Sequence, residues 1–162
     1  MAVKKLTNDI SLVKMSAELV PAVAGIENAC FSHPWTAQGL EAELSKESAF
    51  FYVAVINNIA VGYMGFQIIL DEAYVDNIAV LPEYRRLGAA RALLDNAINI
   101  CISKNVSFIT LEVRPSNTAA LSLYQSAGFV KAGQRRGFYS SPTEDALIMT
   151  RYFNNGESYN EN

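Results

Sequence analysis

The sequence predicts an α/β protein (mixed α+β), with about four helices on both faces of one mixed sheet of roughly six to seven strands. Strand and helix patterns follow the order β-α-α-β-β-β-α-β-α-β-β. Hairpins come first and single strand–helix crossovers come later, which combines antiparallel with parallel pairing. Strict alternation of strand and helix is absent and no Gly-x-Gly-x-x-Gly occurs. A doubly wound dinucleotide-binding fold is therefore excluded.

The N-terminal third predicts one short strand and two helices. Residues 10–14 are the strand candidate. Ser16 is a residue type that caps helices, and the helix that it would begin runs over residues 17–30. The apolar residues of this helix recur at helical spacing: Leu19, Val20, Val23 and Ile26. After a turn at His33-Pro34-Trp35, Thr36 would cap the second helix.

The centre of the chain is rich in strands. Residues 50–56 and 60–70 are predicted strands on either side of Asn57-Asn58, which is typical of a hairpin. A further strand is predicted at 74–80. Its last three residues are all apolar, which fits either a bulge at Ala79 or a strand that is buried on both faces.

Helical crossovers characterise the next part of the chain. Residues 88–103 repeat apolar side chains at helical spacing, and residues 106–113 form a strand. Asn117 would cap a helix that ends near Gly128. Each helix therefore links one strand to another.

Two closing strands are predicted at 132–139 and 145–153. The length of 162 residues fits one domain. We therefore expect a single domain over residues 1–153, followed by a polar C-terminal tail at 154–162.

Composition limits where the protein works. Apolar residues make up 51% of the chain, which is typical of a globular core. Apolar runs are too short to cross a bilayer and no secretory signal is visible, so we expect a cytoplasmic protein without a membrane partner. The net charge of −3 does not favour direct binding to a nucleic acid.

Residue counts also limit the chemistry. There is one histidine, His33, so a multi-histidine metal site is impossible, and we expect no metal. No Gly-x-Ser-x-Gly motif surrounds a serine. The two cysteines, Cys30 and Cys101, form no CxxC pair. The remaining reactive groups are carboxylates, hydroxyls, arginines or a borrowed cofactor.

The most informative segment is VLPEYRRLGAAR at residues 80–91. A strand ends at Val80, Pro82 forces a turn, and a helix then opens with small residues and several arginines. A helix N-terminus offers unpaired N–H groups and the positive end of the helix dipole. Basic residues there oppose the dipole by about 0.3–1 kcal/mol each unless an anion is bound. The segment therefore predicts a pyrophosphate site, against the simpler interpretation of an exposed basic turn.

The pattern Arg85-x-x-Gly88-x-Ala90 after a strand and a proline resembles the acetyl-coenzyme A motif of the GCN5-related N-acetyltransferases (GNAT). The resemblance implies the GNAT fold, with a twisted and mostly antiparallel sheet, and acetyl-CoA as cosubstrate. It also implies that the helix start wraps the pyrophosphate while the preceding strand runs beside pantetheine. The implied cofactor-binding residues are Ile78, Ala79, Val80, Arg85, Arg86, Leu87, Gly88, Ala89, Ala90 and Arg91.

Two side chains are candidates for moving protons. Residues 106–114 alternate, so Glu112 lies near the end of a strand on the face opposite Leu111. By pattern alone, a solvent-facing glutamate is the simpler interpretation. Tyr124 falls on the following helix, where a core aromatic is the simpler interpretation.

A more specific resemblance changes both interpretations. The runs TLEVRPSNTAA at 110–120 and LYQSAGF at 123–129 resemble the RimI group of ribosomal-protein-alanine N-acetyltransferases. In that group the glutamate that matches Glu112 is the general base and the tyrosine that matches Tyr124 is the general acid. The asparagine that matches Asn117 contacts the cofactor.

The likeness covers residues 10–150 and includes RRGFY at 135–139 and EDALIM at 144–149. It implies one N-acetyltransferase domain over residues 1–153. It also implies that the acceptor is a protein N-terminal α-amine, that of the N-terminal alanine of a small-subunit ribosomal protein. The loop at 140–143 is short for the group and Phe138 stands where tyrosine is common, and both departures concern the acceptor.

Two alternatives stay open at the level of the sequence. In the first, the enzyme acetylates lysine side chains, polyamines or another small amine, which acidic residues would attract. The candidate acidic residues are Asp71, Glu72, Asp76, Glu144 and Asp145. In the second, the chain is a non-catalytic acetyl-CoA-binding domain, but the presence of both Glu112 and Tyr124 counts against it.

Overall fold

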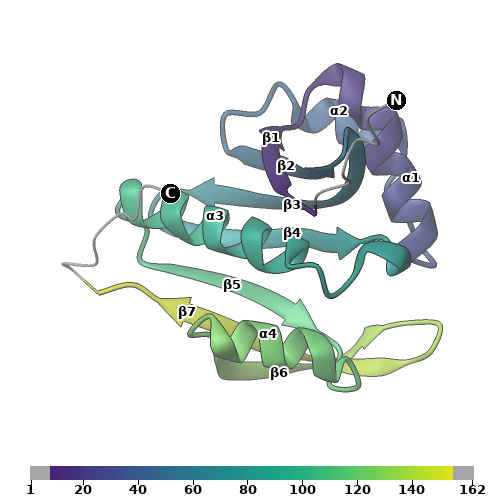
Figure 1. Ribbon diagram of the computed structural model, residues 1–162. Helices are drawn as coiled ribbons and strands as arrows, with labels where there is room; N and C mark the ends of the chain where they lie inside the picture. The colour runs from purple at the N-terminus through teal and green to yellow at the C-terminus, as the bar shows by residue number, and fades with distance from the viewer. Residues whose placement is uncertain (1–7, 155–162) are drawn as a thin grey trace, which may run out of the picture. The chain divides into compact units, whose positions relative to one another are not determined.

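The structure is a computed structural model that describes residues 8–154 of the chain (Figure 1). The predicted polar tail lies outside the described residues from position 155 onward. The order of strands and α-helices is the predicted one. The elements are β1 (Ile10–Lys14), η1 (Ala17–Leu19), α1 (Val20–Cys30), α2 (Ala37–Glu43), β2 (Ala49–Ile56), β3 (Ile59–Ile69), β4 (Glu72–Val80), η2 (Pro82–Tyr84), α3 (Ala89–Ser103), β5 (Phe108–Val113), α4 (Thr118–Ser126), β6 (Val130–Tyr139) and β7 (Glu144–Tyr152).

The strands follow the order β1-β2-β3-β4-β5-β7-β6 in a seven-stranded sheet. Strands β1 and β2 are antiparallel, as are β5 and β7 and also β6 and β7. The pairing of β4 with β5 is parallel, because the chain crosses from one to the other through α3. The predicted mixed, mostly antiparallel sheet with four α-helices is confirmed.

The chain divides into two compact units. The N-terminal unit comprises residues 8–65 and 77–93 of the described chain, and the C-terminal unit comprises residues 66–76 and 94–154. Strands β3 and β4 and helix α3 each contribute residues to both units. Among residues 8–154, no helix is both long enough and apolar enough to span a bilayer.

Aromatic packing defines the core of the N-terminal unit. The ring of Phe51 on β2 stacks on Tyr63 of β3 at 6.3 Å and contacts Trp35 at 5.9 Å. A Cβ atom at Gly65 would overlap the Phe51 ring, so this position of β3 has room only for glycine. Helix α1 covers the cluster with Val23 and Ile26, both fully buried.

One predicted turn and two predicted helix caps are confirmed. Asn57 and Asn58 have φ values of 48° and 65°, and this pair of left-handed residues forms the tight hairpin between β2 and β3. Thr36 Oγ1 accepts the Gly39 N–H at 3.0 Å and caps α2. Asn117 Oδ1 accepts the Ala120 N–H at 3.1 Å and caps α4.

The predicted cap at Ser16 is wrong. Its side chain makes no capping hydrogen bond, and a 3-10 turn precedes the α-helix, which begins only at Val20. Pro21 explains the later start, since proline has no N–H to donate and fits the first turn of a helix.

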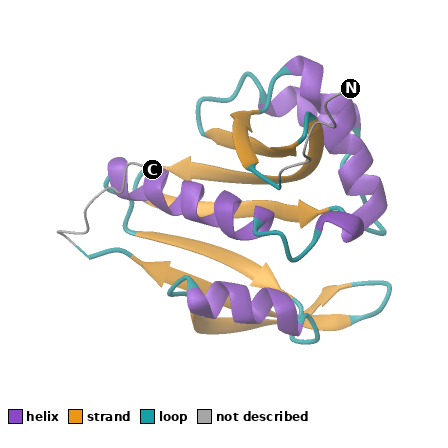
Figure 2. Ribbon diagram, viewed as in Figure 1, coloured by secondary structure: helices purple, strands orange, loops and turns teal. Residues whose placement is uncertain are grey.

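In the C-terminal unit, the side chains of β5 alternate between the two faces of the sheet. Ile109, Leu111 and Val113 are buried, whereas Phe108 and Glu112 alternate with them and are half-buried. Helices α3 and α4 both lie on one face of this unit's sheet (Figure 2). That face is the one of Ile109, because its partner Arg151 on β7 donates from Nη1 to the Ala127 carbonyl at the end of α4, at 2.9 Å. Within the described part of this unit, the face that holds Glu112 carries no helix.

Candidate active site

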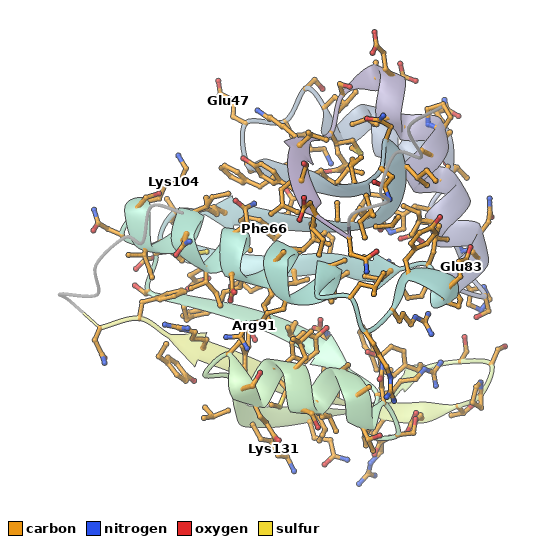
Figure 3. All side chains as sticks on the ribbon, viewed as in Figure 1. Glu47, Phe66, Glu83, Arg91, Lys104 and Lys131 are labelled. Carbon is orange, nitrogen blue, oxygen red and sulfur yellow. The ribbon has the colours of Figure 1, made fainter. Side chains whose placement is uncertain are left out.

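The predicted anion-binding segment lies in the N-terminal unit between β4 and α3. After η2, the backbone takes left-handed conformations at Arg86 (φ 63°) and Gly88 (φ 94°) before α3 begins. Figure 3 shows Glu83 in the turn before the helix and Arg91 on the helix itself. The sharp turn directs the chain into the helix N-terminus, where the first N–H groups have no partner within the helix. This local geometry fits a pyrophosphate.

The side chains of the segment differ in exposure. Residues 85 to 88 are exposed, Ala89 is 2% exposed and Ala90 is half-buried. A Cβ atom at Gly88 would have Ile10 Cδ1 as its nearest neighbour, at 3.8 Å, so space is open there and the backbone conformation sets the need for glycine. Residues 85 to 88 before α3 are therefore accessible to a ligand, whereas Ala89 is a packing residue.

Arg85 reaches back to the preceding strand. Its Nε donates to the Val80 carbonyl at 3.1 Å, and Cys30 Sγ donates to the same oxygen at 3.5 Å. Burial raises the pKa of the Cys30 thiol, which keeps the proton on this sulfur. Arg85 thus fixes the turn between the strand and the segment.

The end of β4 is held from the β3 side as well. The Leu81 N–H donates to the Val61 carbonyl at 2.8 Å. A Cβ atom at Gly62 would lie 2.8 Å from the Ala79 carbonyl oxygen, so glycine permits this close approach of the strands. Ala79 and Val80 are both buried and Ile78 is half-buried, which is the pattern of a strand covered on both faces.

A buried carboxylate that was not among the predicted site residues lies in the same unit. Glu27 on α1 is 0% exposed, and its Oε2 accepts the Trp35 backbone N–H at 3.1 Å. Its Oε1 accepts Asn77 Nδ2 at 2.7 Å and the Tyr63 hydroxyl. One carboxylate therefore joins α1, the Trp35 turn, β3 and β4. The sequence could have indicated that Glu27 is buried, because position 27 lies one helical turn after Val23 on the apolar side of the helix.

Glu112 lies near the end of β5 in the C-terminal unit. Its side chain is 31% exposed, and Oε1 accepts Arg135 Nη1 at 3.0 Å. Arg135 is 55% exposed, and its guanidinium lies 5.1 Å from the Phe138 ring centre. Because both partners face solvent, the ion pair orients the carboxylate without locking it away from a ligand.

Tyr124 on α4 is 5% exposed, with its ring 5.7 Å from that of Phe129. Burial raises the pKa of the Tyr124 hydroxyl well above its usual range, and the neighbouring Tyr139 adds to this. The phenol therefore holds its proton at neutral pH.

Tyr139 was not among the predicted site residues. Burial first, and then the negative charge of Glu112, raise the pKa of Tyr139 to about 12. The Arg114 guanidinium lies 4.3 Å from the centre of the Tyr139 ring. Tyr139 ends β6, so hairpin register rather than any local motif brings it to Glu112.

Hydrogen bonds fix the loop between β6 and β7 to the end of β5. Arg114 donates to the Ser140 carbonyl at 3.1 Å and the Pro142 carbonyl at 2.9 Å. The Ser116 hydroxyl donates to Glu144 at 2.8 Å, and this bond is the main cause of a lowered pKa for the Glu144 carboxyl. The short loop at 140–143 is therefore held firmly.

The predicted site residues fall into two groups. The residues from Ile78 to Arg91 belong to the N-terminal unit, and Glu112, Asn117 and Tyr124 belong to the C-terminal unit. The five acidic residues considered for cation binding each accept a hydrogen bond from a neighbour: Asp71, Glu72, Asp76, Glu144 and Asp145.

Comparison with known proteins shows the family to which the chain belongs. A model of the Acetyltransferase (GNAT) family matches residues 20–129. The chain belongs to this family and is an acetyl-CoA-dependent N-acetyltransferase, as the sequence predicts.

Two relatives and one solved structure show which GNAT enzymes the chain is similar to. The [ribosomal protein bS18]-alanine N-acetyltransferase of Escherichia coli strain K12 is 37% identical over 132 residues, which are 80% of this chain and 88% of the relative. The Salmonella typhimurium relative of the same description is 35% identical over 144 residues, 88% of this chain and 95% of its own. The crystal structure of the Escherichia coli ribosomal-protein-S18-alanine N-acetyltransferase superposes with a TM-score of 0.82 and 32% identity, covering 93% of this chain and 99% of that one.

Proposed function

We propose that this enzyme transfers the acetyl group of acetyl-CoA to the N-terminal α-amine of a protein, namely the N-terminal alanine of ribosomal protein bS18. The observation that carries the proposal is the similarity to the Escherichia coli enzyme of that description over 80% of this chain. The proposal includes a cytoplasmic location. It also treats residues 1–153 as one N-acetyltransferase domain.

The segment before α3 would hold the cosubstrate. Residues 86–91 offer backbone N–H groups and arginines to the pyrophosphate, with Ile78, Ala79 and Val80 beside the pantetheine. Arg85 supports this arrangement through its bond to the Val80 carbonyl. Asn117 would contribute from the C-terminal unit, although its carbonyl oxygen also caps α4.

Acetyl-CoA supplies an activated thioester, so direct attack by the amine needs no covalent enzyme intermediate. An α-amine has a pKa of about 7.7–8.0 and a lysine side chain about 10.4. The difference of roughly 2.5 units corresponds to about 3.5 kcal/mol of deprotonation free energy. One carboxylate therefore serves an N-terminal amine more easily than a lysine, which favours the N-terminal acceptor.

Glu112 would accept the proton of the amine, directly or through water. Its partial exposure and its exposed partner Arg135 support this role, because an incoming amine can compete for the carboxylate. Tyr124 would donate its proton to the departing sulfur, because its phenol carries a proton at neutral pH. Each proton transfer then involves one side chain, and no histidine or cysteine is needed.

A screen of acceptors tests the proposal. The measurement is release of coenzyme A thiol with an alanine-starting bS18 peptide, the same peptide blocked at its N-terminus, a lysine peptide and polyamines. We expect the highest kcat/KM for the free alanine-starting peptide and no turnover of the blocked form. A higher kcat/KM for the lysine peptide or a polyamine would overturn the acceptor assignment.

A further inference from the structure

The C-terminal unit has one sheet face that none of its described helices covers. Register places residues of three strands on it: Glu72 pairs with Phe108, and Phe108 pairs with Tyr152. Tyr74 pairs with Thr110 one step further along the strands. Phe108, Thr110 and Glu112 alternate along β5, so the proposed base lies on the same face. We call this face the open face.

Three aromatic side chains form a row across the open face. The ring of Tyr74 meets Phe108 edge-on at 6.1 Å, and Phe108 meets Tyr152 at 6.3 Å. Tyr74 is 40% exposed and Tyr152 is 58% exposed. Ring surface left in water on three adjacent strands is the kind of patch that marks a binding surface.

Carboxylates border the aromatic row. Glu72 accepts the Tyr74 hydroxyl, Asp71 accepts the Ser107 hydroxyl at 2.6 Å, and Asp76 accepts Gln67 Nε2 at 2.7 Å. Exposed ring faces and carboxylates together favour lysine and arginine side chains. A second copy of this chain fits less well, since a two-fold interface sets the same acidic patch against itself.

The spacing along β5 gives the length of the occupant. Phe108 and Glu112 are four residues apart, which is about 13 Å along a strand. An extended polypeptide spans that distance with about four residues. A chain whose amine lies at Glu112 and which follows β5 therefore brings its residues from about the fourth onward to the aromatic row.

We propose that the aromatic row of Tyr74, Phe108 and Tyr152 binds the fourth to sixth residues of the acceptor polypeptide, as an extended basic segment. The inference rests on the proposed function, because the position of the acceptor amine at Glu112 sets the direction and the distance. It extends that function from a single N-terminal residue to a stretch of sequence behind it.

Acceptor peptides of two lengths test the inference. The probes are an alanine-starting tripeptide and two alanine-starting nonapeptides, with lysine or with glutamate at positions four to six. We expect the basic nonapeptide to have a KM about tenfold below that of the tripeptide, as two exposed cation–ring contacts would give. The kcat should be the same for both, and the acidic nonapeptide should lose the gain.

The Tyr74→Ser/Tyr152→Ser double variant should raise the KM of the basic nonapeptide to that of the tripeptide. Its kinetics with the tripeptide should match those of the wild type. Ile59→Ser is the matched control, because Ile59 is a 47% exposed apolar side chain at the start of β3 in the N-terminal unit. Binding of the labelled basic nonapeptide, followed by fluorescence anisotropy, gives the same comparison without turnover.

Three results would overturn the inference. The first is an equal KM for the tripeptide and the basic nonapeptide. The second is a double variant in which the KM values of both peptides rise by the same factor. The third is a wild-type dimer that the double variant converts to a monomer in sedimentation, which would assign the row to a second copy. The tripeptide separates the two proposals: its acetylation with no length effect removes only the inference, and failure to acetylate any N-terminal peptide removes the proposed function.

Discussion

Glu112 combines two properties that a single residue needs in order to act as a base. It lies near the end of a central strand whose other face is buried. Its carboxylate is nevertheless 31% exposed, and it is paired with the exposed Arg135. The position along β5 follows from the alternating sequence. The partner does not, because Arg135 arrives on a hairpin 23 residues further along the chain.

Replacing Glu112 by glutamine should lower kcat by roughly 10²-fold or more, as loss of a general base does. The rise of the rate with pH should flatten as well, since the amide cannot accept the proton. Steady-state kinetics from pH 6 to 9 measure both effects. Glu41→Gln on the exposed side of α2 is the control. An unchanged pH profile in the Glu112 variant would exclude it as the base.

Replacing Tyr124 by phenylalanine should slow the chemical step, again by roughly 10²-fold, and leave the affinity for acetyl-CoA unchanged. Single-turnover kinetics and calorimetry separate these quantities. Tyr52→Phe on β2 serves as the control for loss of a phenol elsewhere. If acetyl-CoA affinity falls while the chemical step keeps its rate, the role as an acid is wrong.

Replacing Glu27 by alanine should lower the free energy of unfolding by roughly 3–5 kcal/mol, because the buried Tyr63 hydroxyl and two half-buried donors, the Trp35 N–H and Asn77 Nδ2, lose their acceptor. Urea unfolding measures the change. The comparison is Glu43→Ala, which removes a 7% exposed carboxylate whose 2.6 Å ion pair with Lys46 lies half in solvent. An equal loss of unfolding free energy in the two variants would mean that the Glu27 hydrogen bonds stabilise the fold no more than the half-exposed Glu43 ion pair does.

At the scale of elements, local patterns predicted most of the fold. The strand Ile10–Lys14 matches to the residue, and the caps at Thr36 and Asn117 hold. These features depend on neighbours within a few positions. The late start of α1 after Ser16 depends on Pro21, which outweighs the capping preference of serine.

Long-range register explains what the patterns could not supply. The bonds of Glu27 to Tyr63 and Asn77 join positions 36 and 50 residues away. Tyr139 comes near Glu112 only through the pairing of β6 with β7, which shifts register between Arg135 and Tyr139. No local spacing encodes such a shift. Local patterns could therefore point to Glu112 and Tyr124 as candidate base and acid, but not to the groups that surround them.

The turn before α3 gives a prediction at this scale. Gly88→Ala should weaken acetyl-CoA binding about tenfold, since a left-handed backbone costs a side chain about 1–2 kcal/mol and the turn would relax. Calorimetric titration with acetyl-CoA measures the affinity. Gly25→Ala on α1 is the control, because no atom lies within 4 Å of the new Cβ and the helix gains about 0.5–1 kcal/mol. Unchanged affinity in the Gly88 variant would support the simpler interpretation of an exposed helix start.

At the scale of the whole molecule, stability should fall as the pH rises above about 9. Burial raises the pKa of Cys101 and of Tyr139 to about 12 in each case. The unfolded chain loses these protons first, at the ordinary values of about 8.5 for a thiol and about 10 for a phenol. The folded state therefore loses stability between about pH 9 and pH 12.

Urea unfolding at pH 8 and at pH 10.5 measures this loss. Tyr139→Phe should reduce it, because one of the contributing titrations disappears. A free energy of unfolding that stays constant up to pH 10.5 would contradict the assignment of both groups.

The turn held by Glu27 has an optical consequence. Trp35 is the only tryptophan of the 162 residues, and its backbone and ring are fixed within the N-terminal unit by Glu27 and Phe51. Tryptophan emission therefore reports on that unit alone, whereas circular dichroism of the peptide bonds reports on the whole chain. Superimposable unfolding curves from the two signals would indicate one cooperative transition, and separated curves would indicate two.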